Sequence, residues 1–167
     1  MGSRAQACAG FALLAAVRCT RQTVVDRLAD RFSQARQQPS PDAFQVVPGF
    51  QQTASAAIIV HGQTRLTFHV TVPAHAAFVT RVGLANLNDP LCGAADASFM
   101  VGVSDGRSFR QLRTLVLRDR LAKQYIPIEV SLAEYSGMTI DLILNTRMPL
   151  QDGSQSDVVW IDPAVAH

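Results

Sequence analysis

The chain has 167 residues, of which 48% are hydrophobic, and its formal net charge is +2 at pH 7. This length fits one domain of ordinary size with a real core, and the hydrophobic fraction excludes general disorder. The basic residues of the run Arg107–Arg120 alternate with Asp105 and Asp119 and do not gather with aromatic residues on one face, so we expect no nucleic-acid partner.

The first apolar run covers residues 5–17, AQACAGFALLAAV, and lies between Arg4 and Arg18. It is too short to span a bilayer, which needs about 20 residues. A basic start followed by an apolar run resembles a signal peptide, but Arg18 and Cys19 stand where small residues should define a cleavage site. We therefore expect a segment that docks on a partner or a membrane surface. An uncleaved signal and packing on its own domain are the alternatives.

An amphipathic pattern follows over residues 20–37, where Val24, Leu28 and Phe32 recur on one side of a helix. The pattern ends before Pro39 and Pro41, which cannot continue a helix. We predict an N-terminal apolar and amphipathic helical segment over residues 1–38, which anchors or docks the chain, and a linker over residues 39–43. The side chains expected to dock are Phe11, Leu13, Leu14, Val17, Val24, Leu28 and Phe32.

The hydrophobic period changes to two from residue 44. In RLTFHVTVP, residues 65–73, Leu66, Phe68 and Val70 alternate with polar residues, which is typical of a half-buried strand. Further short strands, separated by Gly, Pro, Asn and Asp, are expected at 56–60, 77–86, 98–104, 113–119, 126–132, 138–146 and 157–165. We predict an all-β domain over residues 44–167, an antiparallel sandwich or a small barrel.

Several of these segments resemble a known family. The succession LTFHVTVP, VGL, FMVGVSDG, IPIEVSLAEYSGMTIDLILNT and VVWIDPAV is similar to the jelly-roll modules of the galactose-binding-like superfamily. It looks most like the carbohydrate-binding module often attached to bacterial glycoside hydrolases, and the resemblance covers residues 50–166. The resemblance implies an antiparallel jelly-roll β-sandwich, here with an N-terminal helical extension. It also implies a structural role for Tyr135 and, in some members, a structural calcium ion at a loop.

The sequence does not bring catalytic groups together. No pair of carboxylates, and no nucleophile with its base, can be assigned from spacing, so we expect a chain that is not an enzyme. The loop at residues 85–96 offers hard oxygen ligands of the kind that calcium takes, and the candidates are Asn88, Asp89 and Asp96. Asn, Asp, Pro and Gly also make ordinary surface turns, so the alternative is a loop without metal. We expect no other cofactor.

A glycan site would use exposed aromatic rings for stacking and polar groups for the sugar hydroxyls. Trp160 is the only tryptophan, and it shares the strand phase of Val158, which favours burial in the core over stacking on a sugar. The candidate glycan contacts are the rings of Phe109 and Tyr125 and the amides of Asn86 and Asn88.

Two functions are consistent with these features. The first is a non-catalytic accessory or interaction subunit, whose N-terminal segment anchors or docks a β-sandwich on a membrane-associated multiprotein assembly. Its partners would be other protein subunits or the membrane surface. The alternative is a carbohydrate-binding module with a glycan as partner, exported or held at the cell surface. Either function predicts a membrane-associated or extracytoplasmic location, on the periplasmic side.

Overall fold

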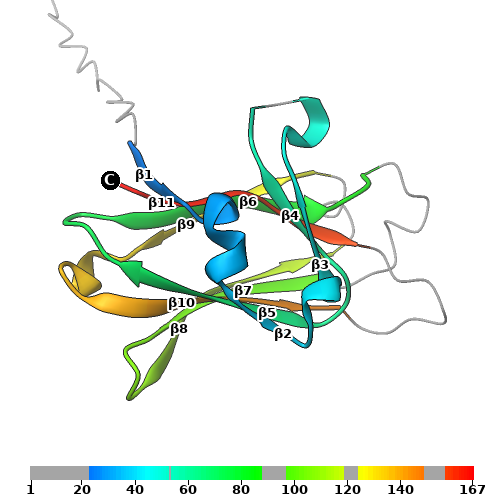
Figure 1. Cartoon of the computed structure of the whole chain (residues 1–167). Helices are drawn as coiled ribbons and strands as arrows, with labels where there is room; N and C mark the ends of the chain where they lie inside the picture. The colour runs from blue at the N-terminus through cyan, green and yellow to red at the C-terminus, as the bar shows by residue number, and fades with distance from the viewer. Residues whose placement is uncertain (1–22, 53, 88–96, 119–123, 149–156) are drawn as a thin grey trace, which may run out of the picture.

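A computed structural model describes residues 23–52, 54–87, 97–118, 124–148 and 157–167. Figure 1 shows two antiparallel sheets packed face to face. Seven predicted site residues lie outside the described residues: the docking residues Phe11, Leu13, Leu14 and Val17, and the calcium candidates Asn88, Asp89 and Asp96.

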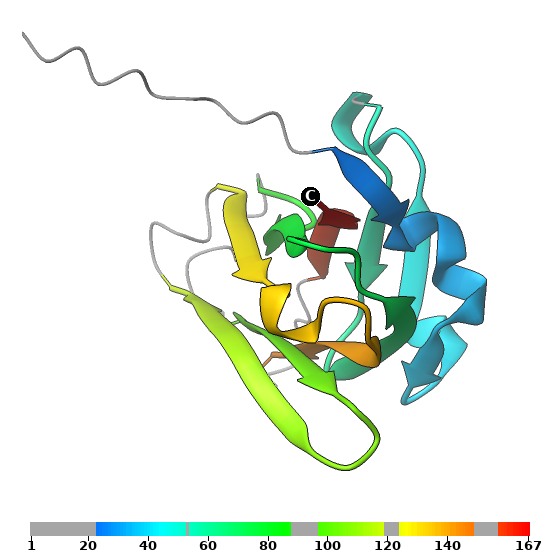
Figure 2. The same cartoon turned by 90° about the vertical axis from the view of Figure 1, so that its left-hand side faces the viewer.

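Among the described residues, six strands form one sheet, in the order β3-β4-β11-β6-β9, and β1 pairs with the far end of β11. Their bounds are β1 Val24–Arg27, β3 Phe44–Val47, β4 Ala57–Val60, β6 Ala77–Leu84, β9 Ile126–Ser131 and β11 Val158–Ala166. We call this the six-stranded sheet. Figures 1 and 2 both show β1 beside the C-terminal end of the chain.

The other sheet has the order β2-β5-β10-β7-β8, and we call it the five-stranded sheet. Its strands are β2 Arg36–Gln38, β5 Thr64–Thr71, β7 Ala97–Ser104, β8 Phe109–Leu117 and β10 Thr139–Arg147. Short 3-10 helices η1 Leu28–Gln34, η2 Pro41–Ala43, η3 Phe50–Gln52 and η5 Ala133–Tyr135 lie in the connections. The predicted antiparallel jelly-roll sandwich is therefore confirmed.

The core lies between the two sheets and follows the alternation of the sequence. In β5 the side chains of Leu66, Phe68 and Val70 are buried, while those of Arg65 and His69 are exposed on the other face. Strand β10 pairs with β5 over its length and alternates in register with it, so the inner faces of both strands meet the opposite sheet. Half-buried strands of this kind leave the outer face of the five-stranded sheet open to solvent.

Trp160 lies in the middle of this core and is 1% exposed. Its ring contacts Phe99 edge to face, with centroids 5.1 Å apart, and Phe78 at 6.5 Å. The indole Nε1–H donates a hydrogen bond to Thr146 Oγ1 at 3.1 Å, which satisfies the one polar group of the ring. The prediction that Trp160 is buried in the core is confirmed.

The helix predicted over residues 20–37 is wrong for its described part. Residues 24–38 form β1, the short 3-10 helix η1 and β2, and β1 and β2 belong to opposite sheets. Of the apolar residues at helical spacing, Leu28 is buried in the core of the same domain and Phe32 packs against it, whereas Val24 is exposed. Leu28 is 0% exposed, so its side chain is not available to dock on a partner. Within the described part of the chain, no helix is long and apolar enough to cross a membrane.

Candidate functional site

The outer face of the five-stranded sheet carries mostly polar side chains. Hydrogen-bonded register places one outward side chain from each strand in a single row, which consists of Gln38, Arg65, Asn145, Met100 and Thr114. The next row along the strands consists of Arg36, Thr67, Ile143, Gly102 and Gln111. Five strands spaced about 4.8 Å apart extend for about 19 Å, so each row is long enough to meet an extended ligand.

Two adjoining hollows lie on this sheet and share Asn145 and Arg147 in their walls. The larger, of about 370 Å³, is lined by Gln38, Pro39, Gln63, Thr64, Arg65, Asn145, Thr146 and Arg147. The smaller, of about 190 Å³, is lined by Ser98, Met100, Gln111, Thr114, Asn145 and Arg147. Together they extend from β2 to β8, and we call them the polar trough.

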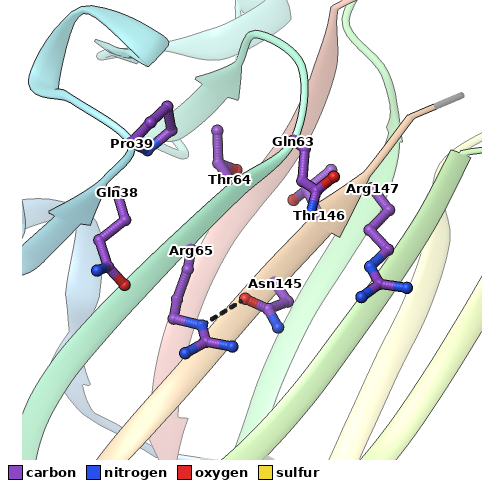
Figure 3. Close-up of a pocket in the computed structure, with 8 residues that line it drawn as sticks. All are labelled: Gln38, Pro39, Gln63, Thr64, Arg65, Asn145, Thr146 and Arg147. Carbon is purple, nitrogen blue, oxygen red and sulfur yellow. Dashed lines mark hydrogen bonds between the residues drawn. The ribbon is translucent and has the colours of Figure 1, made fainter. Parts of the chain in front are cut away.

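Figure 3 shows the larger hollow, with the side chains of Arg65, Asn145 and Arg147 on the same side of the sheet. Arg65 Nε donates to Asn145 Oδ1 at 3.0 Å, which holds the two side chains across neighbouring strands. Thr64 and Thr146 are buried and pair with each other across β5 and β10, so they form the floor at the end of the sheet. The side chains of Arg65 and Asn145 extend above this floor.

Phe109 brings an aromatic ring to the same face. It is 51% exposed and lies in register with Ser104, which pairs in turn with Asp141. The ring lies over Gly102, because a Cβ atom on that glycine would come within 2.6 Å of the ring carbon Cε2. Figures 1 and 2 show that the hairpin joining β7 and β8, which carries this ring, projects beyond the rest of the sandwich. Phe109 is therefore an open stacking surface at the edge of the polar face.

Tyr125 lies elsewhere, on the outer face of the six-stranded sheet. It packs edge to face on Phe50 with centroids 6.0 Å apart, and its ring covers Gly83. With Ala57, Val159 and Ile161 these residues form a second, small apolar cluster outside the main core. Burial raises the pKa of the Tyr125 phenol, and Gln51 Nε2 donates a hydrogen bond to its oxygen. Tyr125 thus fastens the segment around η3 to the sheet.

The two aromatic residues among the predicted glycan contacts are therefore not brought together. Phe109 and Tyr125 lie on different sheets, Asn86 follows β6, and Asn88 is outside the described residues. Arg65, Asn145 and Arg147, which gather in the polar trough, were not among the predicted site residues. Arg65 lies on the polar phase of the predicted strand at 65–73, Asn145 lies in the predicted strand at 138–146, and Arg147 follows it. Only the pairing of β5 with β10 brings the three residues to one surface.

Two histidine–aspartate pairs lie away from the trough walls. His61 Nδ1 is 2.6 Å from Asp157 Oδ1, and His69 Nδ1 is 3.0 Å from Asp141 Oδ1. Each pair contains two potential ligands, whereas a zinc site needs three or four. Among the residues that the structure describes, no group of three or more His, Cys, Asp or Glu side chains could hold a metal ion.

Comparison with solved structures relates this fold to carbohydrate-binding modules. A family 61 carbohydrate-binding module, solved in complex with β-1,4-galactotriose, covers 80% of this chain and 88% of its own, with 19% sequence identity and a TM-score of 0.52. The family 22 xylan-binding domain from Paenibacillus barcinonensis covers 79% and 84%, with 12% identity and a TM-score of 0.47. A family 51 module from Clostridium perfringens, in complex with methyl-galactose, covers 80% and 87%, with 14% identity and a TM-score of 0.46.

No protein-family model matches the chain, and no curated protein matches it. The likeness to the family 61 module shows a shared fold at low sequence identity. The predicted resemblance to jelly-roll carbohydrate-binding modules is confirmed at the level of the fold. Function resides in the site and not in the fold, so the polar trough has to carry the functional argument.

Proposed function

We propose that the chain is a non-catalytic carbohydrate-binding module that holds a glycan chain across the outer face of the five-stranded sheet. The observation that carries the proposal is the polar trough, which crosses the strands from β2 to β8. Amide and guanidinium groups in its walls match the hydroxyl groups of sugars as hydrogen-bond donors and acceptors. The exposed ring of Phe109, at the edge of the same face, offers a surface on which a sugar ring can stack.

The other predicted function, docking on a membrane-associated assembly, receives no support from the described residues. Leu28 lies in the sandwich core, and Phe32 packs against that core. Val24 is partly exposed on β1, but that strand pairs with β11 as part of the six-stranded sheet. A docking role for the residues before 23 stays a prediction. A glycan-binding module meets its ligand outside the cytoplasm, so we expect an extracytoplasmic location.

Glycan binding by the full chain, measured by calorimetry against a panel of soluble polysaccharides, tests the proposal. The informative variant is Gln111→Leu, which removes one amide from the trough on the edge strand β8. Gln45→Leu makes the same chemical change at an exposed position of the edge strand β3 in the six-stranded sheet. We expect Gln111→Leu to weaken glycan binding about three- to tenfold, since one hydrogen bond contributes about 0.5–1.5 kcal/mol.

Gln45→Leu should leave the affinity unchanged, because its side chain lies on the other sheet. Equal losses in the two variants would place the ligand outside the trough. A panel without any binding glycan would remove the proposal altogether. Thermal melts of both variants show whether each retains the fold, since an exposed glutamine contributes little to stability.

A further inference from the structure

Two guanidinium groups flank one amide in the polar trough. Arg65 on β5 pairs with Asn145 on β10, and Arg147 lies two residues further along β10 on the same face. Side chains related in this diagonal way have Cα atoms about 7–8 Å apart. Figure 3 shows Arg65, Asn145 and Arg147 side by side above the sheet. One small group could therefore contact both arginines at once.

The three side chains offer many more hydrogen-bond donors than acceptors. Arg65 Nε donates to Asn145 Oδ1 at 3.0 Å, which occupies one of the two lone pairs of the amide oxygen. The two hydrogens on Asn145 Nδ2 and the terminal nitrogens of Arg65 and Arg147 are all donors, because a guanidinium has no acceptor. A neutral sugar hydroxyl could satisfy one donor at a time. A group with several acceptor oxygens and a negative charge satisfies the whole set.

The charge balance of the trough points the same way. None of the described residues that line either hollow is acidic. The ion pairs found among the described residues include neither Arg65 nor Arg147. The acidic group on this face is Asp141, which lies four residues along β10 from Asn145, about 13 Å away, and hydrogen-bonds His69. Among the described residues, no neighbouring carboxylate forms an ion pair with either arginine.

We infer that the polar trough selects an anionic glycan, with a uronate carboxylate or an ester sulfate bound by Arg65, Asn145 Nδ2 and Arg147. Arginine suits this task because its planar fork forms two parallel hydrogen bonds to such a group. This inference rests on the proposed glycan-binding function and names the ligand class of the same trough. No covalent step is involved, and the ligand is held by charge-assisted hydrogen bonds.

The test compares acidic polysaccharides with neutral forms of the same backbone. Polygalacturonate is measured beside carboxyl-reduced polygalacturonate, and a sulfated galactan beside its desulfated form, with the full-length protein in each titration. We expect the acidic member of at least one pair to bind about tenfold more tightly than its neutral form. That affinity should fall as the salt rises from about 50 to about 500 mM, since ions screen the attraction. The pair that responds identifies the carboxylate or the sulfate as the recognised group.

Arginine variants locate the preference. Arg147→Gln should lower the ratio of acidic to neutral affinity about tenfold, because it removes one of the two charge-assisted contacts. Arg147→Lys keeps the charge without the fork, so it should retain the salt dependence with a smaller loss. The control is Arg81→Gln on β6, an exposed arginine of the six-stranded sheet, which should not change the ratio. Thermal melts confirm that each variant is folded.

Two outcomes overturn the inference in different ways. If neutral and acidic chains bind equally, and Arg147→Gln behaves as Arg81→Gln does, the trough binds glycans without regard to charge. The proposed function then stands and the inference fails. If neither member of either pair binds, and the neutral panel is also silent, the proposed function fails together with the inference.

Discussion

The ring of Phe109 depends on a single residue beneath it. Gly102 has no side chain, and an added Cβ would lie 2.6 Å from the ring and 3.1 Å from the carbonyl oxygen of Arg110. Because Phe109 is exposed, the ring can move away, whereas the backbone of β8 can yield only a little. A substitution of Gly102 should therefore displace the Phe109 ring and have a smaller effect on the stability of the sandwich.

We predict that Gly102→Ala and Phe109→Ala both weaken glycan binding about tenfold. The estimate follows from stacking on nucleic-acid bases, where one aromatic ring contributes about 1–3 kcal/mol. Calorimetric titration with the glycan that binds best provides the measurement. Val25→Ala is the control, since Val25 is also an exposed hydrophobic residue but lies on β1 of the six-stranded sheet. Wild-type affinity in both Phe109→Ala and Gly102→Ala would show that the ring takes no part in binding.

Trp160 and Thr146 make a buried polar pair, which gives a second prediction at the residue scale. Trp160→Phe removes part of a fully buried ring and leaves the Thr146 hydroxyl without its donor. We expect the free energy of unfolding to fall by about 2–3 kcal/mol, measured by urea denaturation followed by circular dichroism. Adding Thr146→Val removes the orphaned hydroxyl and should recover part of the loss. A change in glycan affinity without a loss of stability would contradict the structural role of Trp160.

The β7–β8 hairpin is held at its turn by one carboxylate. The backbone N–H groups of Ser108 and Arg107 donate to Asp105 Oδ1 at 2.8 and 2.9 Å, and these bonds hold the pKa of Asp105 below its ordinary value of 3.8. The folded pKa is depressed, so the carboxylate stabilises the turn above the unfolded pKa and the contribution is lost as the pH falls through the folded pKa. Because this hairpin carries Phe109, protonation of Asp105 at acid pH should weaken the turn beside that ring.

An NMR titration of the Asp105 carboxyl should therefore give a midpoint below 3.8, and the protection of the turn amides, relative to the intrinsic exchange rate at each pH, should fall as the carboxylate is protonated. In Asp105→Asn the side chain keeps an acceptor oxygen but cannot titrate. The protection of its turn amides should therefore stay constant across this pH range. A midpoint at or above the ordinary value in the wild type would show that the two amides do not hold the carboxylate in solution.

At the scale of single elements, the sequence predicts strands better than it predicts the N-terminal region. Alternation in β5 and β10 reports burial on one face, and the structure confirms it. Residues 24–35 have apolar positions at helical spacing, but this spacing fits a strand followed by a 3-10 turn equally well. The β-branched pair Val24 and Val25 favours an extended backbone, and pairing with β11 selects it. Tertiary contacts of this kind are invisible to a local pattern.

At the scale of the whole molecule, the polar trough could not be predicted from the sequence because it depends on strand order. Gln38, Arg65, Asn145, Met100 and Thr114 come from five separate strands, and only the order β2-β5-β10-β7-β8 places them in one row. Each reads alone as an ordinary solvent-facing position. The search for exposed aromatic rings did identify Phe109, which is exposed on this face. The same criterion selected Tyr125, whose ring packs on a separate apolar cluster.

The N-terminal strands close the sandwich, because the chain passes from one sheet to the other through η1. Strand β1 pairs with the end of β11, and Thr23 and His167 exchange backbone hydrogen bonds of 2.7 and 3.0 Å. Strand β2 then pairs with β5 in the opposite sheet, and Leu28 between them is fully buried. Figure 1 shows η1 on the flank of the sandwich between β1 and β2. Removing this region would take one strand from each sheet, β1 from the six-stranded sheet and β2 from the five-stranded sheet.

We therefore predict that deletion of residues 1–37 destabilises the sandwich and does not merely release an anchor. A single substitution separates the two effects: Leu28→Ala should lower the free energy of unfolding by about 2–5 kcal/mol, since it leaves a cavity in the core. Val25→Ala, at a position 49% exposed on β1, should change it by less than about 0.5 kcal/mol. Urea denaturation of the full chain gives both values. A deletion variant that keeps the wild-type melting temperature and loses only its association with partners would instead restore the docking role of this region, because that result requires a sandwich complete without β1, η1 and β2.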